Sequence, residues 1–309
     1  MGTPEFSVPC LEMLINEGYT VKAVISQPDR PKGRGKKVSF LPVKETSLKY
    51  GIDVFQPLNV RDGKLEEFIK NLSPDLIITV AYGRILPASI LNIPKYGCIN
   101  VHASLLPKYR GASPIQYSII NGEEKTGVTT MFMDEGMDTG DILLKSEMNI
   151  TQDMTGGQLH DALSIMGAAL LKDTLIKMQE GTITRIAQNN DDASYVSMLT
   201  KDTGHIHWSS NCNSIYNLVR GIDPYPGAYT HYKQEIMKVW KLEMLSERTD
   251  EMIPGTVYKV DSKGIYVACK DYGAKIIILQ FPSSKRMLVS EYLKGHKIDA
   301  GIILGETKA

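Results

Sequence analysis

Short apolar runs alternate with amphipathic stretches along the first 180 residues. The apolar runs predict strands, and the stretches between them predict helices. The expected strands are 21–26, 54–55, 76–80 and 97–101, and the expected helices are 7–17, 42–50, 63–71 and 87–91. Apolar strands that alternate with helices are typical of a parallel sheet covered on both faces. The pattern therefore predicts an α/β fold built on a mostly parallel sheet.

The same unit continues to about residue 181. A helix at 115–121, with Pro114 in its first turn, is followed by strands at 126–133 and 141–150. The longest predicted helix covers 155–180, because its apolar residues recur every three or four positions and Gly181 is a natural stop. The segment 188–204 is polar and rich in Asn, Asp and Thr, which indicates a linker.

Beyond the linker the period of the pattern changes. A helix is expected at 208–220, followed by a turn at Pro224-Tyr225-Pro226-Gly227 and by short alternating runs. Several short strands at this spacing predict a small antiparallel barrel. We therefore expect a catalytic domain at 1–181, a linker at 182–203 and a smaller domain at 204–309.

Composition adds few constraints. Hydrophobic residues make up 42% of the chain, charged residues make up 23%, and the formal net charge is zero, so a polyanion would have to bind a local basic patch. No apolar run reaches the roughly 18 residues of a membrane span, and the N-terminus lacks the regions of a signal peptide. The four cysteines are dispersed, and the histidines lack metal-ligand spacing. We expect a cytoplasmic protein with reduced thiols and no metal.

The candidate chemistry begins at the end of the strand 97–101. Alternate side chains of a strand share a face, so Asn100 and His102 are expected to project the same way. Downstream, Gly136-Met137-Asp138-Thr139-Gly140-Asp141 predicts a turn that returns a carboxylate toward that strand end. An imidazole, a carboxylate and an amide donor suit acyl transfer. The alternative is a purely structural role, in which the histidine caps the strand and the asparagine supplies hydrogen bonds to a turn.

No nucleophile motif accompanies these groups. The chain has neither a Gly-x-Ser-x-Gly elbow nor a convincing cysteine nucleophile. Direct transfer from a carrier to an amine is therefore favoured over a covalent enzyme intermediate.

A second candidate is the basic loop 29–37. Arg30, Lys32, Arg34, Lys36 and Lys37 alternate with glycines and repel one another unless an anion is present, which suits binding to phosphates. A solvated loop is the alternative. In the smaller domain, Lys233, Lys238 and Lys241 are expected to share a face with Tyr232 and Trp240, as a further nucleic-acid surface or merely a solubilising one.

Two long motifs then point to a family. Asn100-x-His102-x-Ser104-Leu105-Leu106-Pro107-x-Tyr109-Arg110-Gly111 and the segment from Gly127 to Gly140 resemble the signature of enzymes that use 10-formyltetrahydrofolate as formyl donor. Within that family, Gly2-Thr3-Pro4-Glu5-Phe6-Ser7 and the basic loop are similar to the branch that formylates initiator tRNA.

The resemblance implies a fold and site roles. It implies a Rossmann-like catalytic sheet, an OB-like C-terminal barrel that binds tRNA, and a monomer. Catalytic roles fall to Asn100, His102 and Asp138, and folate contacts to Ser104, Leu105, Leu106, Pro107, Tyr82 and Gly83. Periodicity alone would place 105–107 in the core. Arg30, Arg34, Lys36 and Lys37 would contact tRNA.

Other expectations remain open. In the family a buried strand precedes the turn Gly2-Thr3-Pro4, and this sequence begins at Met1, so we expect a slot between neighbouring strands. The nearest alternative function is a formyltransferase for a small amine, such as an aminated sugar nucleotide or glycinamide ribonucleotide. A non-catalytic RNA-binding protein is a more distant one.

Overall fold

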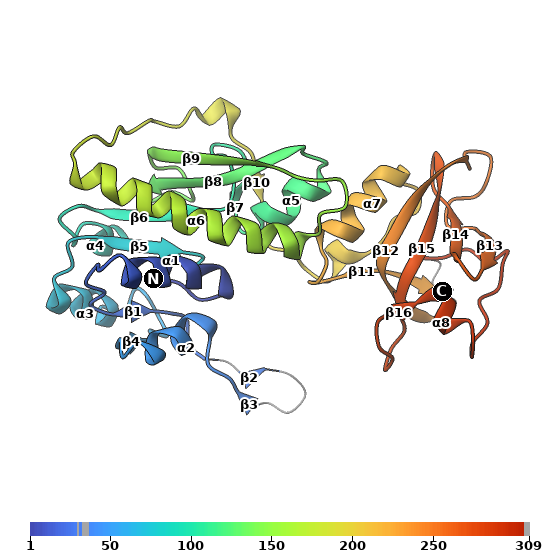
Figure 1. Ribbon diagram of the computed structural model, residues 1–309, viewed down its shortest axis with the longest axis horizontal. Helices are drawn as coiled ribbons and strands as arrows, with labels where there is room; N and C mark the ends of the chain where they lie inside the picture. Colours follow the sequence, from blue (N-terminus) through green and yellow to red (C-terminus); the bar gives the residue numbers. More distant parts are fainter. Residues whose placement is uncertain (30, 33–36, 306–309) are drawn as a thin grey trace. The chain divides into compact units, whose positions relative to one another are not determined.

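The computed structural model describes residues 1–29, 31–32 and 37–305, which divide into two compact units (Figure 1). The units interleave along the chain. The first consists of Met1–Pro114, Lys125–Asn149 and His160–Ser197, and the second of Ile115–Glu124, Ile150–Leu159 and Met198–Ala309. The domain boundaries expected at 181 and 204 stay a prediction.

The early elements follow the predicted order. They are a 3-10 turn η1 (Glu5–Ser7), α1 (Val8–Asn16), β1 (Val24–Ile25), β2 (Pro31–Lys32), β3 (Lys37–Val38), α2 (Pro42–Lys49), β4 (Val54–Phe55), α3 (Lys64–Leu72), β5 (Ile77–Val80), α4 (Ala88–Leu91) and β6 (Cys98–His102). The next ones are β7 (Arg110–Gly111), α5 (Pro114–Ile120), β8 (Lys125–Phe132), β9 (Ile142–Asn149), α6 (Gly156–Gln179), the 3-10 turn η2 (Asn190–Asp192) and β10 (Tyr195–Val196).

The central sheet is mixed, with strand order β5-β6-β8-β9. β5 and β6 run parallel, whereas β6–β8 and β8–β9 are antiparallel. The expectation of a mostly parallel sheet therefore needs correction at this edge. β8 and β9 are separated only by residues 133–141, and a crossover helix needs a longer connection, so the chain returns as a hairpin.

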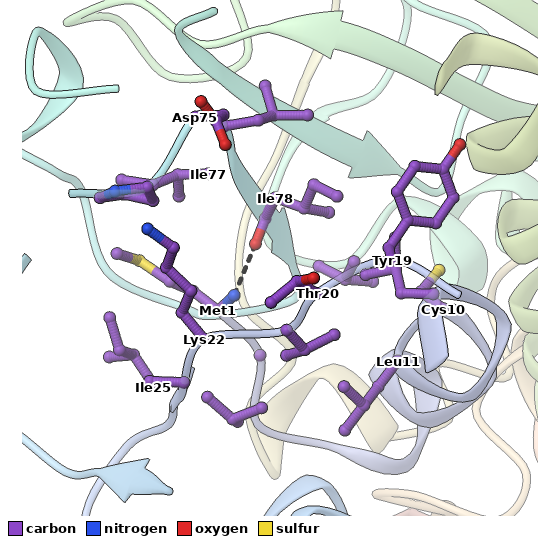
Figure 2. Close-up of a pocket in the computed structure, with 18 of the residues that line it drawn as sticks. Met1, Cys10, Leu11, Tyr19, Thr20, Lys22, Ile25, Asp75, Ile77 and Ile78 are labelled. Carbon is purple, nitrogen blue, oxygen red and sulfur yellow. Dashed lines mark hydrogen bonds between the residues drawn. The ribbon is translucent and has the colours of Figure 1, made fainter. Parts of the chain in front are cut away.

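The other edge of the sheet meets the N-terminus. β1 and β4 form a parallel pair, and Gly2 links this pair to the central sheet. Its amide donates to the carbonyl of Ile25 at 3.0 Å, and Gly2 forms a parallel bridge with Val80. The Met1 amino group donates to the carbonyl of Ile78 (Figure 2).

A cavity of about 730 Å³ opens beside this junction. Its wall includes Leu11 from α1, Val24 and Ile25 from β1, and Ile77 and Ile78 from β5 (Figure 2).

Helix α6 packs on the central sheet. At Gly167 a Cβ atom would lie 3.0 Å from Val101 Cγ1, so the glycine lets the helix approach β6 closely. Further along, Thr174 and Thr130 of β8 share a hydroxyl hydrogen bond of 2.8 Å. This packing buries one face of the strands whose ends carry the polar residues of the site.

The second unit is mostly an antiparallel sheet. Its elements are the 3-10 turn η3 (Asp202–Gly204), α7 (Cys212–Gly221), β11 (Ala228–Tyr232), β12 (Glu235–Arg248), β13 (Val257–Asp261), β14 (Gly264–Ala268), β15 (Tyr272–Gln280), β16 (Met287–Leu288) and α8 (Val289–Tyr292). The strand order is β11-β12-β15-β14-β13, with β16 on β15. Among the described residues no ladder joins β13 to β11, so a closed barrel is not established.

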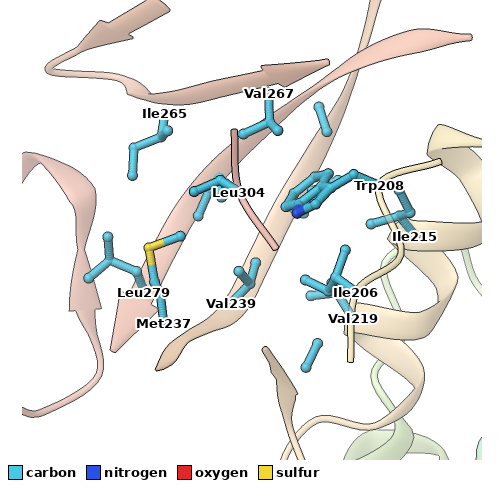
Figure 3. Packing of buried hydrophobic residues seen from close by; sticks show 14 of the residues in the cluster. Ile206, Trp208, Ile215, Val219, Met237, Val239, Ile265, Val267, Leu279 and Leu304 are labelled. Carbon is cyan, nitrogen blue, oxygen red and sulfur yellow. The ribbon is translucent and has the colours of Figure 1, made fainter. Parts of the chain in front are cut away.

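A single apolar cluster fills this unit. The cluster contains Trp208, Ile215 and Val219 of α7, and Met237 and Val239 of β12 (Figure 3). The indole Nε1–H of Trp208 donates to Thr230 Oγ1 at 3.0 Å. Helix α7 begins at Cys212, whereas the sequence predicts a start at residue 208. The difference arises because Trp208 anchors the segment before the helix in the core.

Candidate active site

Three polar side chains from distant positions meet at the end of strand β6. Asn100 and His102 lie two residues apart on this strand and both reach the same carboxylate oxygen, Oδ1 of Asp138. Asn100 Nδ2 donates to it at 3.4 Å, and His102 Nδ1 lies 3.6 Å from it. His102 is buried, while Asn100 and Asp138 are half-buried. The juxtaposition expected from the strand period and the turn glycines is present.

Asp138 sits on the tight turn of the β8–β9 hairpin. Its φ is +57°, a left-handed conformation that costs a residue with a side chain about 1 kcal/mol and that Asp tolerates better than most. Its second oxygen, Oδ2, accepts from the backbone N–H of Gly111 at 2.9 Å. The carboxylate is thus fixed on one side by the backbone and faces the strand end on the other.

The hydrogen bonds of His102 restrict its proton. Nε2 lies 2.9 Å from the carbonyl oxygen of Tyr109, and a carbonyl can only accept, so Nε2 carries a hydrogen. In a neutral ring Nδ1 would then be bare and would face the Asp138 carboxylate. Only the imidazolium can donate toward both oxygens.

The amide of Asn100 is oriented by the neighbouring strand. The Thr79 hydroxyl donates to Asn100 Oδ1 at 2.9 Å, which turns Nδ2 toward Asp138 and the open side of the strand end. Thr79 is buried on β5 and pairs with Asn100 in the parallel ladder. Sequence reasoning missed this residue, although a strand register for 76–80 and 97–101 could have placed it beside Asn100.

One further residue that sequence reasoning missed, Gln188, contacts the Asp138 turn. Gln188 lies in the segment predicted to be a linker, yet its amide donates to the carbonyls of Asp138 and Gly140 at 2.8 and 2.7 Å. Its oxygen accepts from the guanidinium of Arg110 at 2.8 and 3.1 Å. β10, in the same segment, pairs in parallel with β7. No composition signal distinguished this segment from an ordinary linker.

The residues expected at the folate site are largely engaged with the protein. Ser104 is buried, and its hydroxyl donates to the Lys108 carbonyl at 2.6 Å. The Leu106 amide donates to Thr129 Oγ1 at 3.2 Å, and the Leu106 side chain packs with Met131 and Ile142. Leu105 and Pro107 are half-buried. Of the four, these two side chains retain the most access to a ligand.

Tyr82 and Gly83 follow β5 after one intervening residue, Ala81, at the same end of the sheet as His102. The Tyr82 side chain is buried in a core cluster, and burial raises the pKa of its phenol. Its carbonyl accepts from Gln27 Nε2 at 2.9 Å. Gly83 has φ +74°, and a Cβ at this position would lie 2.8 Å from the same Gln27 nitrogen. These residues shape the strand end through their backbone.

The basic loop lies mostly outside the described residues. Arg30, Arg34 and Lys36 are not described, and Lys37 belongs to strand β3, which forms an antiparallel pair with β2. The base of the loop is anchored at Asp29, which forms an ion pair with Lys44 and accepts from Gln56 Nε2 at 3.1 Å. Burial opposes ionisation of Asp29, but these two partners hold its pKa below the ordinary value.

The lysines predicted in the smaller domain divide into two groups. Lys238 and Arg286 both stack on Trp240, with the charged groups 5.1 and 3.7 Å from the ring centroid. Lys233 forms an ion pair of 3.1 Å with Asp299, and Arg286 also forms one, of 2.5 Å, with Asp223. Lys241 is exposed at a register shift in β12. The single face expected for the three lysines is therefore broken up, and Trp240 with its two cations is its most organised part.

The cavity beside Met1 does not belong to this site. None of Asn100, His102 and Asp138 lines it. The second cavity, of about 350 Å³, is lined by residues of β9 and α6 and also misses them. In the part of the chain that the structure describes, no group of three or more His, Cys, Asp or Glu residues has the arrangement of a metal site, and no helix is long and apolar enough to cross a membrane.

Sequence comparisons match both parts of the chain. The family model "Formyl transferase" matches residues 1–175, and "Formyl transferase, C-terminal domain" matches residues 198–297. The chain is 52% identical to a methionyl-tRNA formyltransferase of Acetivibrio thermocellus over 306 residues, covering 99% of this chain and 98% of the relative. It is 53% identical to one from Ruminiclostridium cellulolyticum over 307 residues, with the same coverage of both chains.

Solved structures share the fold at low identity. A sugar 3N-formyl transferase, solved with dTDP and 5-N-formyl-THF, superposes with a TM-score of 0.68 at 19% identity, covering 92% of this chain and 97% of that one. An N-formyltransferase from Helicobacter canadensis, solved with folinic acid and dTDP-3-aminofucose, gives 0.65 at 21% identity, covering 89% and 96%. Together with the family matches and the relatives at about half identity, they show that this chain belongs to the formyl transferase family.

Proposed function

We infer that the protein transfers the formyl group of 10-formyltetrahydrofolate to the amino group of methionine esterified to initiator tRNA. The observation that carries this conclusion is the identity of 52% and 53% to methionyl-tRNA formyltransferases along 99% of the chain. The convergence of Asn100 and His102 on Asp138 supports it, because these groups suit direct acyl transfer to an amine.

Asn100 is proposed to stabilise negative charge on the formyl oxygen. Its amide oxygen is held by Thr79, so Nδ2 is the group directed outward from the strand end. Nδ2 makes only a long contact of 3.4 Å with Asp138, which leaves it able to donate to an incoming oxygen. An oxyanion donor of this kind contributes on the order of 3 kcal/mol to the transition state.

His102 and Asp138 are proposed to move the proton. The attacking amine must lose a proton, and the departing folate nitrogen must gain one. Nε2 of His102 is occupied by the Tyr109 carbonyl, so Nδ1, which faces Asp138, is the nitrogen that exchanges protons. The Asp138 carboxylate balances the charge of the imidazolium while the proton is held there.

The folate donor supplies an activated formyl group bound to nitrogen. We propose that it binds at the strand ends next to His102, where Ser104, Leu105, Leu106, Pro107, Tyr82 and Gly83 lie. Since the Ser104 hydroxyl and the Leu106 amide are engaged within the protein, side-chain contacts would come from Leu105 and Pro107, and polar contacts from backbone groups. The proposed folate contacts are therefore fewer than the sequence predicts, because it assigned them to all of 104–107.

The tRNA is proposed to bind the basic loop, with Arg30, Arg34, Lys36 and Lys37 contacting its phosphates. Trp240, Lys238 and Arg286 offer a second contact surface, because cations stacked on an aromatic ring suit nucleic-acid backbones. We further propose that the second unit closes into an OB-like barrel and that the protein is a monomer. We place it in the cytoplasm, where translation initiates.

The decisive assay offers the purified protein three amines with the same folate donor. These are methionyl-initiator tRNA, a dTDP-aminosugar and glycinamide ribonucleotide, and tetrahydrofolate release is followed for each. Turnover with the charged tRNA alone, falling steeply as salt rises, is the expected result. Turnover with a small amine and none with tRNA would assign the chain to the alternative class. Absence of tetrahydrofolate release with every amine would reject catalysis.

A further inference from the structure

The turn that carries Asp138 is braced within itself by the Thr139 hydroxyl, which donates to Asp134, and from another segment of the chain by the Gln188 side chain. Both hydrogens of its amide are used, since Nε2 donates to the carbonyls of Asp138 and Gly140 at 2.8 and 2.7 Å. Both lone pairs of its oxygen are also used, by Nε and Nη2 of Arg110 at 3.1 and 2.8 Å. Because both amide hydrogens and both oxygen lone pairs of Gln188 are engaged, its side chain has one orientation and restrains the groups that it binds.

Arg110 connects Gln188 to the other support of the carboxylate. The Arg110 side chain is 1% exposed, and it precedes Gly111, whose N–H binds Asp138 Oδ2. Its remaining donors reach Tyr195 Oη at 2.9 Å and Asn190 Oδ1 at 3.0 Å. These partners are neutral, so the buried guanidinium is held by hydrogen bonds and not by an ion pair among the described residues.

The backbone around this pair is equally constrained. Asp138 has φ +57° and Gly111 has φ +115°, and at Gly111 a Cβ would lie 2.3 Å from the Val196 carbonyl oxygen. The Arg110 amide donates to the Ser194 carbonyl at 2.8 Å. The segment 188–196 thus contacts both the turn that carries the Asp138 carboxylate and the stretch 110–111 that binds it. Among the described contacts, only the side chain of Gln188 reaches both.

We propose that Gln188, held by Arg110, is a positioning residue for Asp138 and that it sets the distance between the carboxylate and His102. Asp138 lies in an unfavourable left-handed conformation, so the turn would relax once the two hydrogen bonds to its carbonyls were lost. The distance between the Asp138 carboxylate and Nδ1 of His102 would then increase. A displacement of about 1 Å at such a site can lower the rate on the order of a hundredfold.

The kinetic test rests on the proposed function. Gln188→Met keeps the length of the side chain and removes all four hydrogen bonds, whereas Gln188→Glu keeps the acceptor for Arg110 and loses both donors to the turn. Both variants are expected to lower kcat by about ten- to a hundredfold and to leave KM for charged tRNA within about twofold. Asn190→Ala is the matched control, since it removes a bond to Arg110 without touching the turn, and it is expected to keep kcat within about twofold.

A double-mutant cycle separates positioning from general destabilisation. In an Asp138→Ala background, Gln188→Glu is expected to change kcat by less than about twofold, because the group that it positions is gone. The same loss in both backgrounds would overturn the proposal. So would a wild-type kcat in Gln188→Glu or Gln188→Met protein that melts normally.

A second readout needs no turnover. The ¹⁵N shifts of the His102 ring at one fixed pH report the hydrogen bonding of its two nitrogens, and the Nδ1 signal is expected to change in Gln188→Glu and not in Asn190→Ala. Unchanged shifts in Gln188→Glu would overturn the proposal even if the enzyme acted on another amine. A changed ring signal in a protein that does not formylate charged tRNA would reject the proposed function and keep the positioning role.

Discussion

The Nε2 atom of His102 lies 2.9 Å from the carbonyl oxygen of Tyr109, and the carbonyl leaves this nitrogen no role other than donor. Tyr109 reaches that position with φ +60°, in the loop that also carries Arg110 and Gly111. The contact fixes the ring with Nδ1 toward Asp138. In the proposed mechanism, Nδ1 is therefore the nitrogen that exchanges protons, and substitutions of His102 and Asp138 can separate the charge of the pair from its shape.

Asp138→Asn is expected to lower kcat strongly while KM stays within about threefold. Asparagine keeps the size of the side chain and tolerates a left-handed φ, but it cannot balance an imidazolium. His102→Ala should lower kcat by a similar factor, in the range of about 100 to 10,000 that is typical of general acid–base groups. Steady-state kinetics with charged tRNA measure both. Near wild-type turnover in either variant would remove that residue from the mechanism.

Asn100→Ala is expected to lower kcat by about a hundredfold or more, as the loss of an oxyanion donor does. Thr79→Val should have a smaller effect of about three- to tenfold, because it only frees the amide to rotate and removes one hydrogen bond worth about 1 kcal/mol. The ratio of the two effects is the measurement. A loss in Thr79→Val as large as that in Asn100→Ala, in a protein of unchanged stability, would mean that Thr79 acts on the reaction in some other way.

Arg34→Ala is expected to weaken use of charged tRNA and to leave folate affinity unchanged. Loss of one phosphate contact reduces the slope of log affinity against log salt by about one. KM for tRNA at several salt concentrations and direct binding of a folate analogue test the two parts. Equal damage to folate binding would refute the assignment of the loop to tRNA. Lys22→Ala, on the segment before β1, serves as a control for loss of one positive charge.

The thiols of Cys10 and Cys98 are expected to react slowly in the native protein. Burial raises the pKa of each to about 12, so thiolate is scarce at neutral pH. Alkylation at pH 8 should be at least a hundredfold slower, on an order-of-magnitude scale, in buffer than in urea. The rate in buffer should rise as pH approaches 12, provided that the fold persists. Fast alkylation of Cys10 at pH 8 would show that the neighbouring cavity opens to reagents.

The local elements follow from the sequence because short-range patterns determine them. The predicted helix 42–50 is observed as Pro42–Lys49, and the predicted strand 76–80 as Ile77–Val80. The expected start of a helix at 208 was wrong, since Trp208 is held in the core by Thr230. A periodic pattern shows which residues are apolar but not which of them anchor a loop.

The direction of the strands was predicted less well. The alternation of strands and helices indicated a mostly parallel sheet, whereas β8 runs antiparallel to both of its neighbours, β6 and β9. Pairing direction depends on the connection between strands, and the short Asp138 hairpin makes β8 and β9 antiparallel.

The sequence by itself determined the chemistry available at the site, because residue types and a strand period of two place Asn100 and His102 on one face and the turn glycines bring Asp138 near them. The tertiary structure alone decided how these groups are held. Thr79, Gln188 and the Tyr109 carbonyl reach the site from other strands and loops. Their contacts depend on register and on chain reversals between distant segments, which no local pattern encodes.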